Sequence, residues 1–174
     1  VDQAQVDSGL TKIAANLDAG IARGKLSEAE KQQTLARLSG TTSLTDAARG
    51  ADLVIEAAPE RLELKRDIFT RVAKVVDAKT ILGTNTSSLS IDGLAAGLAS
   101  PERFLGLHFF NPVPASDLVE IVVGARTDPD LVAAAQGWVE ALGKTAITVS
   151  DSPGFASSRL GVAIALEAMR MLKE

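Results

Sequence analysis

The only histidine of the 174-residue chain, His108, lies in an apolar stretch and is followed twelve positions later by an acid, Glu120. A carboxylate beside an imidazole fixes its tautomer and stabilises the imidazolium, which makes the histidine a better base. Ser87 could add a hydroxyl that aligns a substrate oxygen. These residues alone leave another interpretation equally open, in which His108 is a hydrogen-bonded core histidine and Glu120 is a solvated strand residue.

Residues 85–88, Asn-Thr-Ser-Ser, form a polar segment after an apolar run at 80–84. Their amide and hydroxyl groups could bind a polar ligand. By itself the pattern favours a turn that caps the following helix. The two interpretations are compatible, because Ser88 or Ser90 can cap the helix while Ser87 contacts a ligand.

Two apolar runs, 104–110 and 118–123, predict the strands that position His108 and Glu120. Pro112 and Pro114 cannot donate to a strand ladder, so the chain must leave the sheet between the two runs. This places His108 near the end of a strand and brings Glu120 back towards it. Polar groups at strand ends beside irregular loops are where α/β proteins keep their chemistry.

The rest of the chain alternates strands with helices, which predicts an α/β fold with a mostly parallel sheet and helices on both faces. Ligands of such sheets bind beyond the carboxyl ends of the strands. Two helices are expected first, one from Asp2 to Gly24 and one from Ser27 to Gly40, followed by a short β-prone segment at 41–44. Further strands are expected at 51–58, 80–84 and 145–149, and further helices at 62–76, 91–98, 128–142 (with Trp138 and Leu142 facing inward) and 155–174.

Three charged residues could bind a cofactor, although the pattern alone favours ordinary structural roles. Asp2 would follow a strand ending at Val1 and could accept hydrogen bonds from a ribose, or it is a terminal surface acid. Glu60 and Lys65 could hold a cofactor, or they are a helix N-terminal acid and a surface lysine.

Composition narrows the function classes. The net charge is −4 without a basic block, so nucleic acid is not an expected partner. The chain has no cysteine, which excludes disulfides and zinc–thiolate sites and is compatible with a location in the cytoplasm. With one histidine and no cluster of carboxylates, the sequence does not suggest a metal site. No apolar run reaches a membrane span, and no signal peptide is recognised.

The final helix is apolar on several sides, which indicates burial between domains, against a partner chain, or under a further domain of its own chain. The sequence opens on Val-Asp-Gln and closes within a helical pattern, so we expect an internal piece of a longer protein.

Four motifs together resemble the L-3-hydroxyacyl-CoA dehydrogenase family, including bacterial 3-hydroxybutyryl-CoA dehydrogenases. They keep the order and spacing of that family over essentially the whole chain. The motifs are DLVIEAAPERLELKRDIF (52–69), NTSSLSI (85–91), HFFNPVPASDLVEIV (108–122) and DSPGF followed by RL (151–160). The histidine motif with its acid is the most specific of them.

The resemblance implies a Rossmann-like NAD-binding domain over residues 1–150 and the start of an all-helical dimerisation domain over 151–174. The family's glycine-rich G-x-G-x-x-G turn would precede Val1, so this chain would lack the pyrophosphate site and the N-terminal part of the domain. Alone, the piece is therefore expected to be inactive. A homodimer formed through the helical domain is the expected assembly.

The resemblance also implies residue roles. His108 would be the catalytic base, Glu120 its partner acid and Ser87 the substrate-binding serine. The implied cofactor contacts are Asp2 (favouring NAD over NADP), Ala57, Glu60, Lys65, Asn85 and Asn111, and the implied CoA contacts are Arg23 and Lys25. Ser158 occupies the place of an active-site asparagine of the family, and its shorter reach puts the usual acyl preference in doubt.

The implied reaction is NAD-dependent oxidation of an L-3-hydroxyacyl-CoA, such as 3-hydroxybutyryl-CoA, to the 3-oxoacyl-CoA in fatty-acid or related acyl-CoA metabolism. Two alternatives stay open. One is a non-catalytic binding or structural member of the same fold, and the other is a dehydrogenase of a free hydroxy acid or sugar acid.

Overall fold

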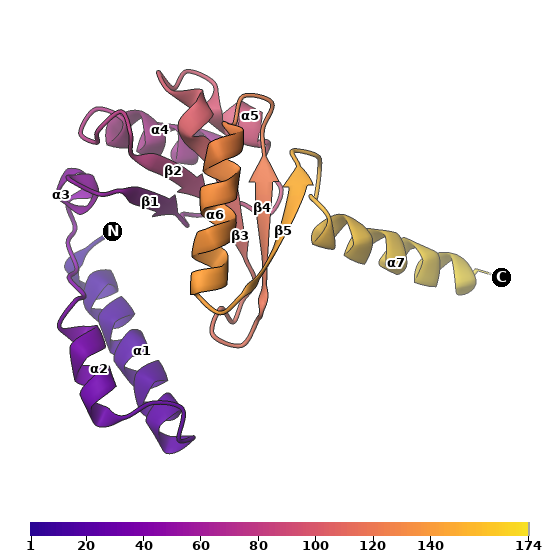
Figure 1. Cartoon of the computed structure of the whole chain (residues 1–174). Coiled ribbons are helices and arrows are strands. Elements are labelled where there is room, and N and C mark those ends of the chain that lie inside the picture. Colours follow the sequence, from indigo (N-terminus) through magenta and orange to yellow (C-terminus); the bar gives the residue numbers. More distant parts are fainter. Residues whose placement is uncertain (174) are drawn as a thin grey trace. The chain divides into compact units, whose positions relative to one another are not determined.

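The computed structural model describes residues 1–173 and divides into two compact units, Val1–Arg49 and Gly50–Glu174 (Figure 1). The first unit is helical. It contains α1 (Gln3–Ala22), α2 (Glu28–Leu35) and α3 (Leu44–Ala48). The second unit contains the sheet and the remaining helices, including the His108 motif.

Capping side chains fix the helix starts of the first unit. Asp2 accepts a hydrogen bond from the Gln5 amide and begins α1, and Ser27 with Glu30 forms the predicted capping box of α2. Two predictions were wrong here. Helix α2 ends at Leu35 and not at Gly40, and residues 41–44 form no strand because Ser43 caps the helix α3 instead. Val1 likewise lies outside any strand.

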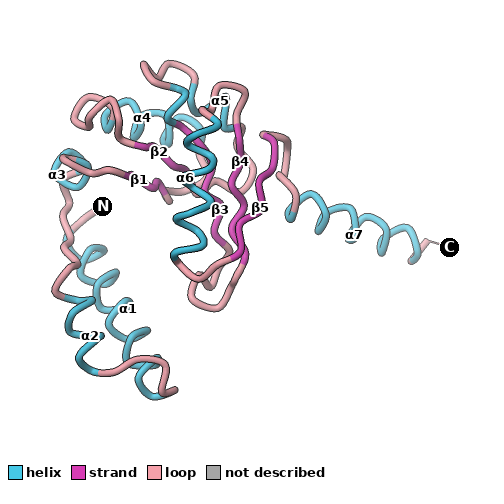
Figure 2. The backbone as a smooth tube through the Cα atoms, viewed as in Figure 1, coloured by secondary structure: helices cyan, strands magenta, loops and turns pink. Residues whose placement is uncertain are grey.

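The second unit is built on a five-stranded sheet in the order β1-β2-β3-β4-β5 (Figure 2). Strands β1, β2 and β3 are parallel to one another, β4 is antiparallel to β3, and β5 is parallel to β4. Their bounds are Leu53–Glu56, Ile81–Thr84, Phe104–Phe109, Leu118–Val123 and Thr145–Ser150. The carboxyl ends of β1, β2 and β3 therefore meet at one edge of the sheet, next to the amino end of β4.

Helices cover both faces of this sheet, as predicted. Helix α6 (Pro129–Ala141) packs its buried side chains against alternate residues of β3 and β4, and this cluster consists of Ile81, Leu105, Leu107, Val119, Ile121, Leu131, Ala135 and Val139. Helices α4 (Leu62–Val72) and α5 (Ile91–Ala95) lie on the opposite face. There Phe69 meets Phe104 edge-on with ring centroids 4.8 Å apart, and a Cβ on Gly106 would collide with Ile91 and Val122.

Several predicted boundaries and orientations differ from the structure. Helices α4 and α5 end early, and β1 has only four residues, of which Ile55 is exposed. Leu142 does not face inward; it caps the end of α6 and is exposed, while Trp138 is half-buried. The inward stripe of α6 instead repeats every four residues from Leu131.

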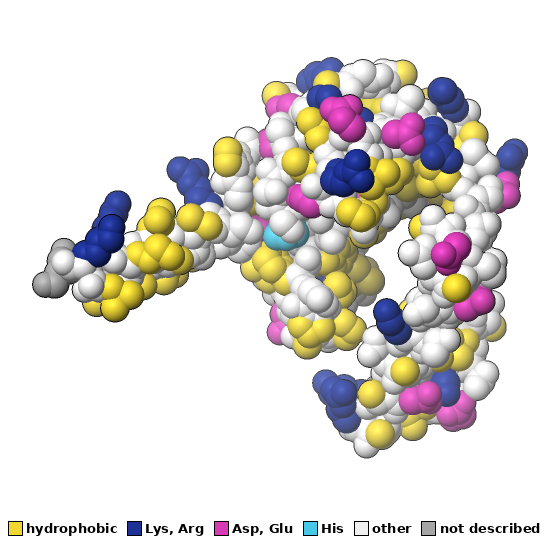
Figure 3. Space-filling model, turned by 180° about the vertical axis from the view of Figure 1, so that it is seen from behind, with side chains coloured by type: hydrophobic (Ala, Val, Ile, Leu, Met, Phe, Trp, Pro, Cys, Tyr) yellow, Lys and Arg dark blue, Asp and Glu magenta, His cyan; other side chains and the backbone are white. Residues whose placement is uncertain are grey.

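Helix α7 (Ser157–Met171) follows β5 and buries none of its residues against the rest of this unit. Its expected burial between domains, against a partner chain or under a further domain of its own chain stays a prediction. Figure 3 shows apolar side chains exposed along α7. They are Leu160, Val162, Ile164, Leu166, Met169 and Met171. Residue 174, which the sequence placed in this helix, lies outside the described residues. Over residues 1–173, no helix is long and apolar enough to cross a bilayer.

Candidate active site

The register of β3 and β4 sets His108 directly opposite Glu120. Both side chains are buried, and His108 Nδ1 lies 2.6 Å from Glu120 Oε2. Because Glu120 is fully enclosed, its interpretation as a solvated strand residue is wrong. A carboxylate can only accept here, so Nδ1 donates its proton to Glu120 and Nε2 is left as the basic nitrogen.

The hydroxyl of Ser87 occupies the other side of the imidazole. Ser87 lies in the loop after β2, and its Oγ is 3.0 Å from His108 Nε2. With Nδ1 protonated, Nε2 accepts a hydrogen bond from this hydroxyl. The parallel pairing of β2 with β3 brings the two residues together, because both strands end at the same edge of the sheet. Part of the histidine is visible at the surface (Figure 3, cyan).

Two aromatic rings border the imidazole. The ring centroid of Phe110 is 4.5 Å from that of His108, and the centroid of Phe155 is 5.7 Å away. Phe155 has a positive φ of 50°, in the turn Gly154–Phe155 that leads from β5 to α7. The apolar rings limit the access of water to the base, and its Nε2 faces Ser87.

Residues at the N-terminus of α7 donate hydrogen bonds to the Glu120 carboxylate. Glu120 Oε1 accepts hydrogen bonds from the amides of Ala156 (3.1 Å) and Ser157 (2.8 Å), and Oε2 accepts one from Ser157 Oγ (3.1 Å). Burial raises the pKa of Glu120, but the hydrogen bonds from His108, Ser157 and Ala156 outweigh it and hold that pKa below its ordinary value. The acid is therefore a carboxylate at neutral pH, as the partner of a base must be.

Sequence reasoning missed Ser157 and chose its neighbour Ser158. Ser158 is half-buried, and within the described residues its side chain makes no hydrogen bond. The available signal was the helix start after the Pro-Gly-Phe turn, because the first amides of a helix have no partner within it and can bind an anion.

A model of the family described as 3-hydroxyacyl-CoA dehydrogenase, NAD binding domain, matches residues 1–152. The chain belongs to this family. The match confirms the resemblance and NAD as the cofactor of the family's domain, and it agrees with the Rossmann-like sheet.

Known members of the family are similar over nearly the whole chain. The 3-hydroxyadipyl-CoA dehydrogenase of Escherichia coli is 43% identical over 162 residues, which are 93% of this chain and 34% of that protein. The 3-hydroxybutyryl-CoA dehydrogenase of Bradyrhizobium diazoefficiens is 38% identical over 170 residues, which are 98% of this chain and 58% of that protein. The chain thus spans between about a third and three fifths of the length of these relatives.

Solved structures give the same result. The crystal structure of 3-hydroxybutyryl-CoA dehydrogenase from Escherichia coli K12 superposes with a TM-score of 0.95 at 39% identity, covering 99% of this chain and 36% of that one. FadB2 of Mycobacterium tuberculosis gives a TM-score of 0.92 at 38% identity, covering 99% of this chain and 61% of that one.

Four of the cofactor residues implied by the resemblance lie near the carboxyl ends of the parallel strands. Ala57 and Glu60 follow β1, Asn85 follows β2 and Asn111 follows β3. Asn85 Oδ1 accepts a hydrogen bond from the Phe109 amide at 2.8 Å, so this side chain cross-links the ends of β2 and β3. Ala57 and Asn111 are exposed.

Asn111 belongs to an exposed turn between β3 and β4. Lys144, which directly precedes β5, binds this turn. Lys144 Nζ donates to the carbonyls of Val113 (2.7 Å) and Ser116 (2.6 Å). The fifth implied cofactor residue, Lys65, differs from the rest because it lies in α4 and is fully buried.

The remaining predicted residues belong to the first unit. Asp2 caps α1, Arg23 follows the end of that helix, and Lys25 is exposed beyond it. Their implied contacts with the adenosine ribose and with CoA stay predictions.

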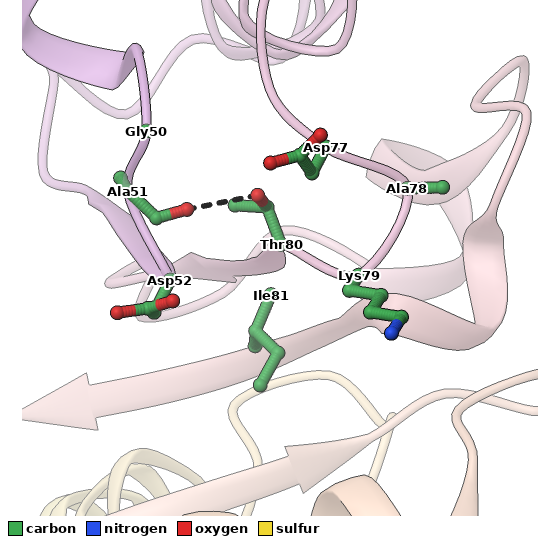
Figure 4. A pocket seen from close by; sticks show the side chains of 8 residues that line it. All are labelled: Gly50, Ala51, Asp52, Asp77, Ala78, Lys79, Thr80 and Ile81. Carbon is green, nitrogen blue, oxygen red and sulfur yellow. Dashed lines mark hydrogen bonds between the residues drawn. The ribbon is translucent and has the colours of Figure 1, made fainter.

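A surface cavity of about 670 Å³ lies at the other edge of the sheet, at the amino ends of β1 and β2 (Figure 4). Asp52, Asp77 and Lys79 line it, and Thr80 Oγ1 donates to the Ala51 carbonyl at 2.8 Å. The cavity shares no residue with the His108 site. No group of three potential metal ligands occurs among residues 1–173.

Replacing Glu120 by glutamine should change how stability depends on pH. A carboxylate with a depressed pKa contributes stability that is fully present above the unfolded value, about 4.3, and is lost as pH falls through the folded value. The free energy of unfolding should therefore fall less for Glu120→Gln than for the wild type between pH 7 and about pH 3.5.

Urea unfolding at both pH values measures this difference. Glu140→Gln, at an exposed position of α6, is the control for how the loss of a surface carboxylate changes the pH dependence of the free energy of unfolding. Equal pH dependence of the wild type and Glu120→Gln would contradict the depressed pKa of Glu120.

Proposed function

We propose that the complete protein oxidises L-3-hydroxyacyl-CoA thioesters, such as 3-hydroxybutyryl-CoA, to 3-oxoacyl-CoA with NAD in fatty-acid or related acyl-CoA metabolism. The observation that carries the proposal is the oriented base. His108 is locked by Glu120 at 2.6 Å on one nitrogen and meets Ser87 at 3.0 Å on the other. An alcohol oxygen entering beside Ser87 would find both a proton acceptor and a hydrogen-bond donor.

Each of the three site residues then has one role in the reaction. His108 Nε2 takes the proton of the 3-hydroxyl group, and Ser87 orients the reacting oxygen. Glu120 stabilises the imidazolium that forms, supported by the α7 amides. Bound NAD supplies the hydride acceptor for the substrate's C3.

The loops at the carboxyl ends of β1, β2 and β3 are suited to binding a dinucleotide. Three neighbouring parallel strands end in loops that expose Ala57, Ser87 and Asn111, where sheets of this type bind nucleotides. Asn85 uses its oxygen within the chain and makes no hydrogen bond through its amide nitrogen among the described residues, so that group can serve a ligand. We assign the nicotinamide side of the cofactor to these residues, with Asp2 proposed for the adenosine ribose.

The test is the oxidation of NADH by the complete protein, followed by absorbance, with acetoacetyl-CoA as substrate. We expect turnover with acetoacetyl-CoA and NADH and much slower turnover with NADPH, because an acid at the ribose repels the extra phosphate. Free acetoacetate is the matched control for the CoA group.

Two results would contradict the proposal. Equal turnover of free acetoacetate would favour the alternative, a dehydrogenase of free hydroxy acids. No turnover of any 3-oxoacyl-CoA, with NADH bound, would favour the non-catalytic alternative, and the serine at position 158 would then be the first residue to restore to asparagine.

The assembly and location belong to the same proposal. The exposed apolar side chains of α7 suit burial against other helices, which supports a homodimer formed through a helical domain that begins with this segment. The cysteine-free sequence supports a cytoplasmic location.

A further inference from the structure

The Glu60 carboxylate binds the loop that presents Ser87 at several points. Glu60 Oε1 accepts hydrogen bonds from Thr86 Oγ1 (2.5 Å), the Ser87 amide (3.0 Å), the Ser88 amide (3.1 Å) and Ser88 Oγ (3.2 Å). These donors are three consecutive residues of the segment after β2. No other side chain among residues 1–173 bonds to the backbone of Ser87.

Glu60 is itself tied to the interior of the sheet by Lys65. The ammonium of Lys65 is 3.4 Å from Glu60 Oε2, and it donates to both oxygens of Glu56 (2.8 and 3.0 Å) and to the Ala58 carbonyl (3.0 Å). Lys65 is 1% exposed. These partners enclose its charge within the chain, so its effect on a ligand passes through them.

The Glu60 carboxylate stays ionised in this setting. Burial raises its pKa, but the hydrogen bonds from Thr86, Ser87 and Ser88 and the charge of Lys65 outweigh it and hold the pKa below its ordinary value. Hydrogen bonds from backbone amides to a charged acceptor are stronger than neutral ones, so Glu60 restrains the loop more than a neutral side chain would.

We propose that Glu60 is a positioning residue for the dehydrogenase reaction, acting through Ser87, and that Lys65 fixes Glu60. The inference rests on the proposed function. It gives these two residues a role inside the chain, besides the direct contacts with the cofactor that the resemblance implied. The placement of the Ser87 hydroxyl at 3.0 Å from the base depends on the loop backbone, and small displacements of a reacting group are costly.

The first test is Glu60→Gln in the complete protein, assayed with acetoacetyl-CoA and NADH. Glutamine keeps the length of the side chain but loses the charge that the loop amides and Lys65 share. We expect kcat to fall by about tenfold, because the Ser87 hydroxyl loses its fixed position.

Glu63→Gln is the matched control. Glu63 lies three residues along the chain, in the first turn of α4, and its side chain is 82% exposed. It should leave kcat and the Kd of NADH as in the wild type. Glu60→Asp keeps the charge with a shorter reach, and it should recover part of the kcat lost in Glu60→Gln.

A double-mutant cycle decides whether Glu60 acts through Ser87. If it does, adding Glu60→Gln to Ser87→Ala should cost little further activity, because the hydroxyl to be positioned is already gone. Additive losses in the double variant, or weaker NADH binding by Glu60→Gln with kcat intact, would overturn the proposal in favour of a direct cofactor contact.

A measurement without turnover separates this inference from the proposed function. Amide hydrogen exchange at Ser87 and Ser88 should be faster in Glu60→Gln than in the wild type, while exchange in β3 stays the same. Unchanged exchange at these two amides would overturn the positioning role even in an active enzyme. Faster exchange in a protein that turns over no acyl-CoA would still support the role of Glu60 in fixing the Ser87 loop. It would contradict only the proposed reaction.

Discussion

His108→Ala should lower the turnover of 3-oxoacyl-CoA by the complete protein roughly 10²–10⁴-fold, the usual contribution of a general base or acid. The substitution removes the only imidazole of the chain. It leaves Glu120 as a buried carboxylate held by Ala156 and Ser157, and it leaves Ser87 without its acceptor. Neither residue can take over the proton, because Glu120 is enclosed and a serine hydroxyl is too weak a base.

Single-turnover and steady-state rates of NADH oxidation measure the effect. The Kd of NADH should stay near the wild-type value, which shows that the variant is folded and binds cofactor. Glu120→Gln should cost less than His108→Ala, since glutamine can still accept from Nδ1. Undiminished turnover in His108→Ala would exclude His108 as the base, and an equal loss in Glu120→Gln would mean that the acid does more than orient the imidazole.

Glu56→Gln should destabilise the fold by about 3–5 kcal/mol, the usual cost of removing one partner of a buried ion pair. Glu56 and Lys65 are both buried, with Nζ 2.8 Å from Oε1. Thr84 Oγ1 also donates to Glu56 at 2.8 Å, so the pair joins β1, β2 and α4. Without the carboxylate, the Lys65 ammonium keeps only neutral acceptors, the glutamine oxygen and the Ala58 carbonyl, and the more distant charge of Glu60.

Urea unfolding at pH 7 gives the free energy of unfolding. The double variant Glu56→Gln/Lys65→Met is the control, because replacing both charges removes the uncompensated ion and should recover most of the lost stability. If the double variant is as unstable as Glu56→Gln, the loss comes from packing or from the Thr84 hydrogen bond, and the ion-pair explanation is wrong. The exposed pair Arg170–Glu167 offers a surface comparison, for which little change is expected.

Local pattern was sufficient for most elements of the sheet. The strands at 104–109 and 118–123 were predicted nearly to the residue because apolar side chains run continuously through them and Pro112 and Pro114 break the ladder between them. The capping box at Ser27 was equally readable. The errors fell at helix ends and in the short segment 41–44, where Ser43 favours a cap over the β propensity of the threonines.

Short motifs, their spacing and the order of the strands were enough to predict the fold class and the family, and the resemblance to that family implied the pairing of His108 with Glu120. The groups that support that pair could be identified only from the folded chain. The contacts of Ser157 with Glu120 and of Glu60 with the Ser87 loop join residues 37 and 27 positions apart. Such contacts depend on where helices begin and how they pack against the sheet, and a difference of one residue changes which side chain faces the site, as Ser157 and Ser158 show.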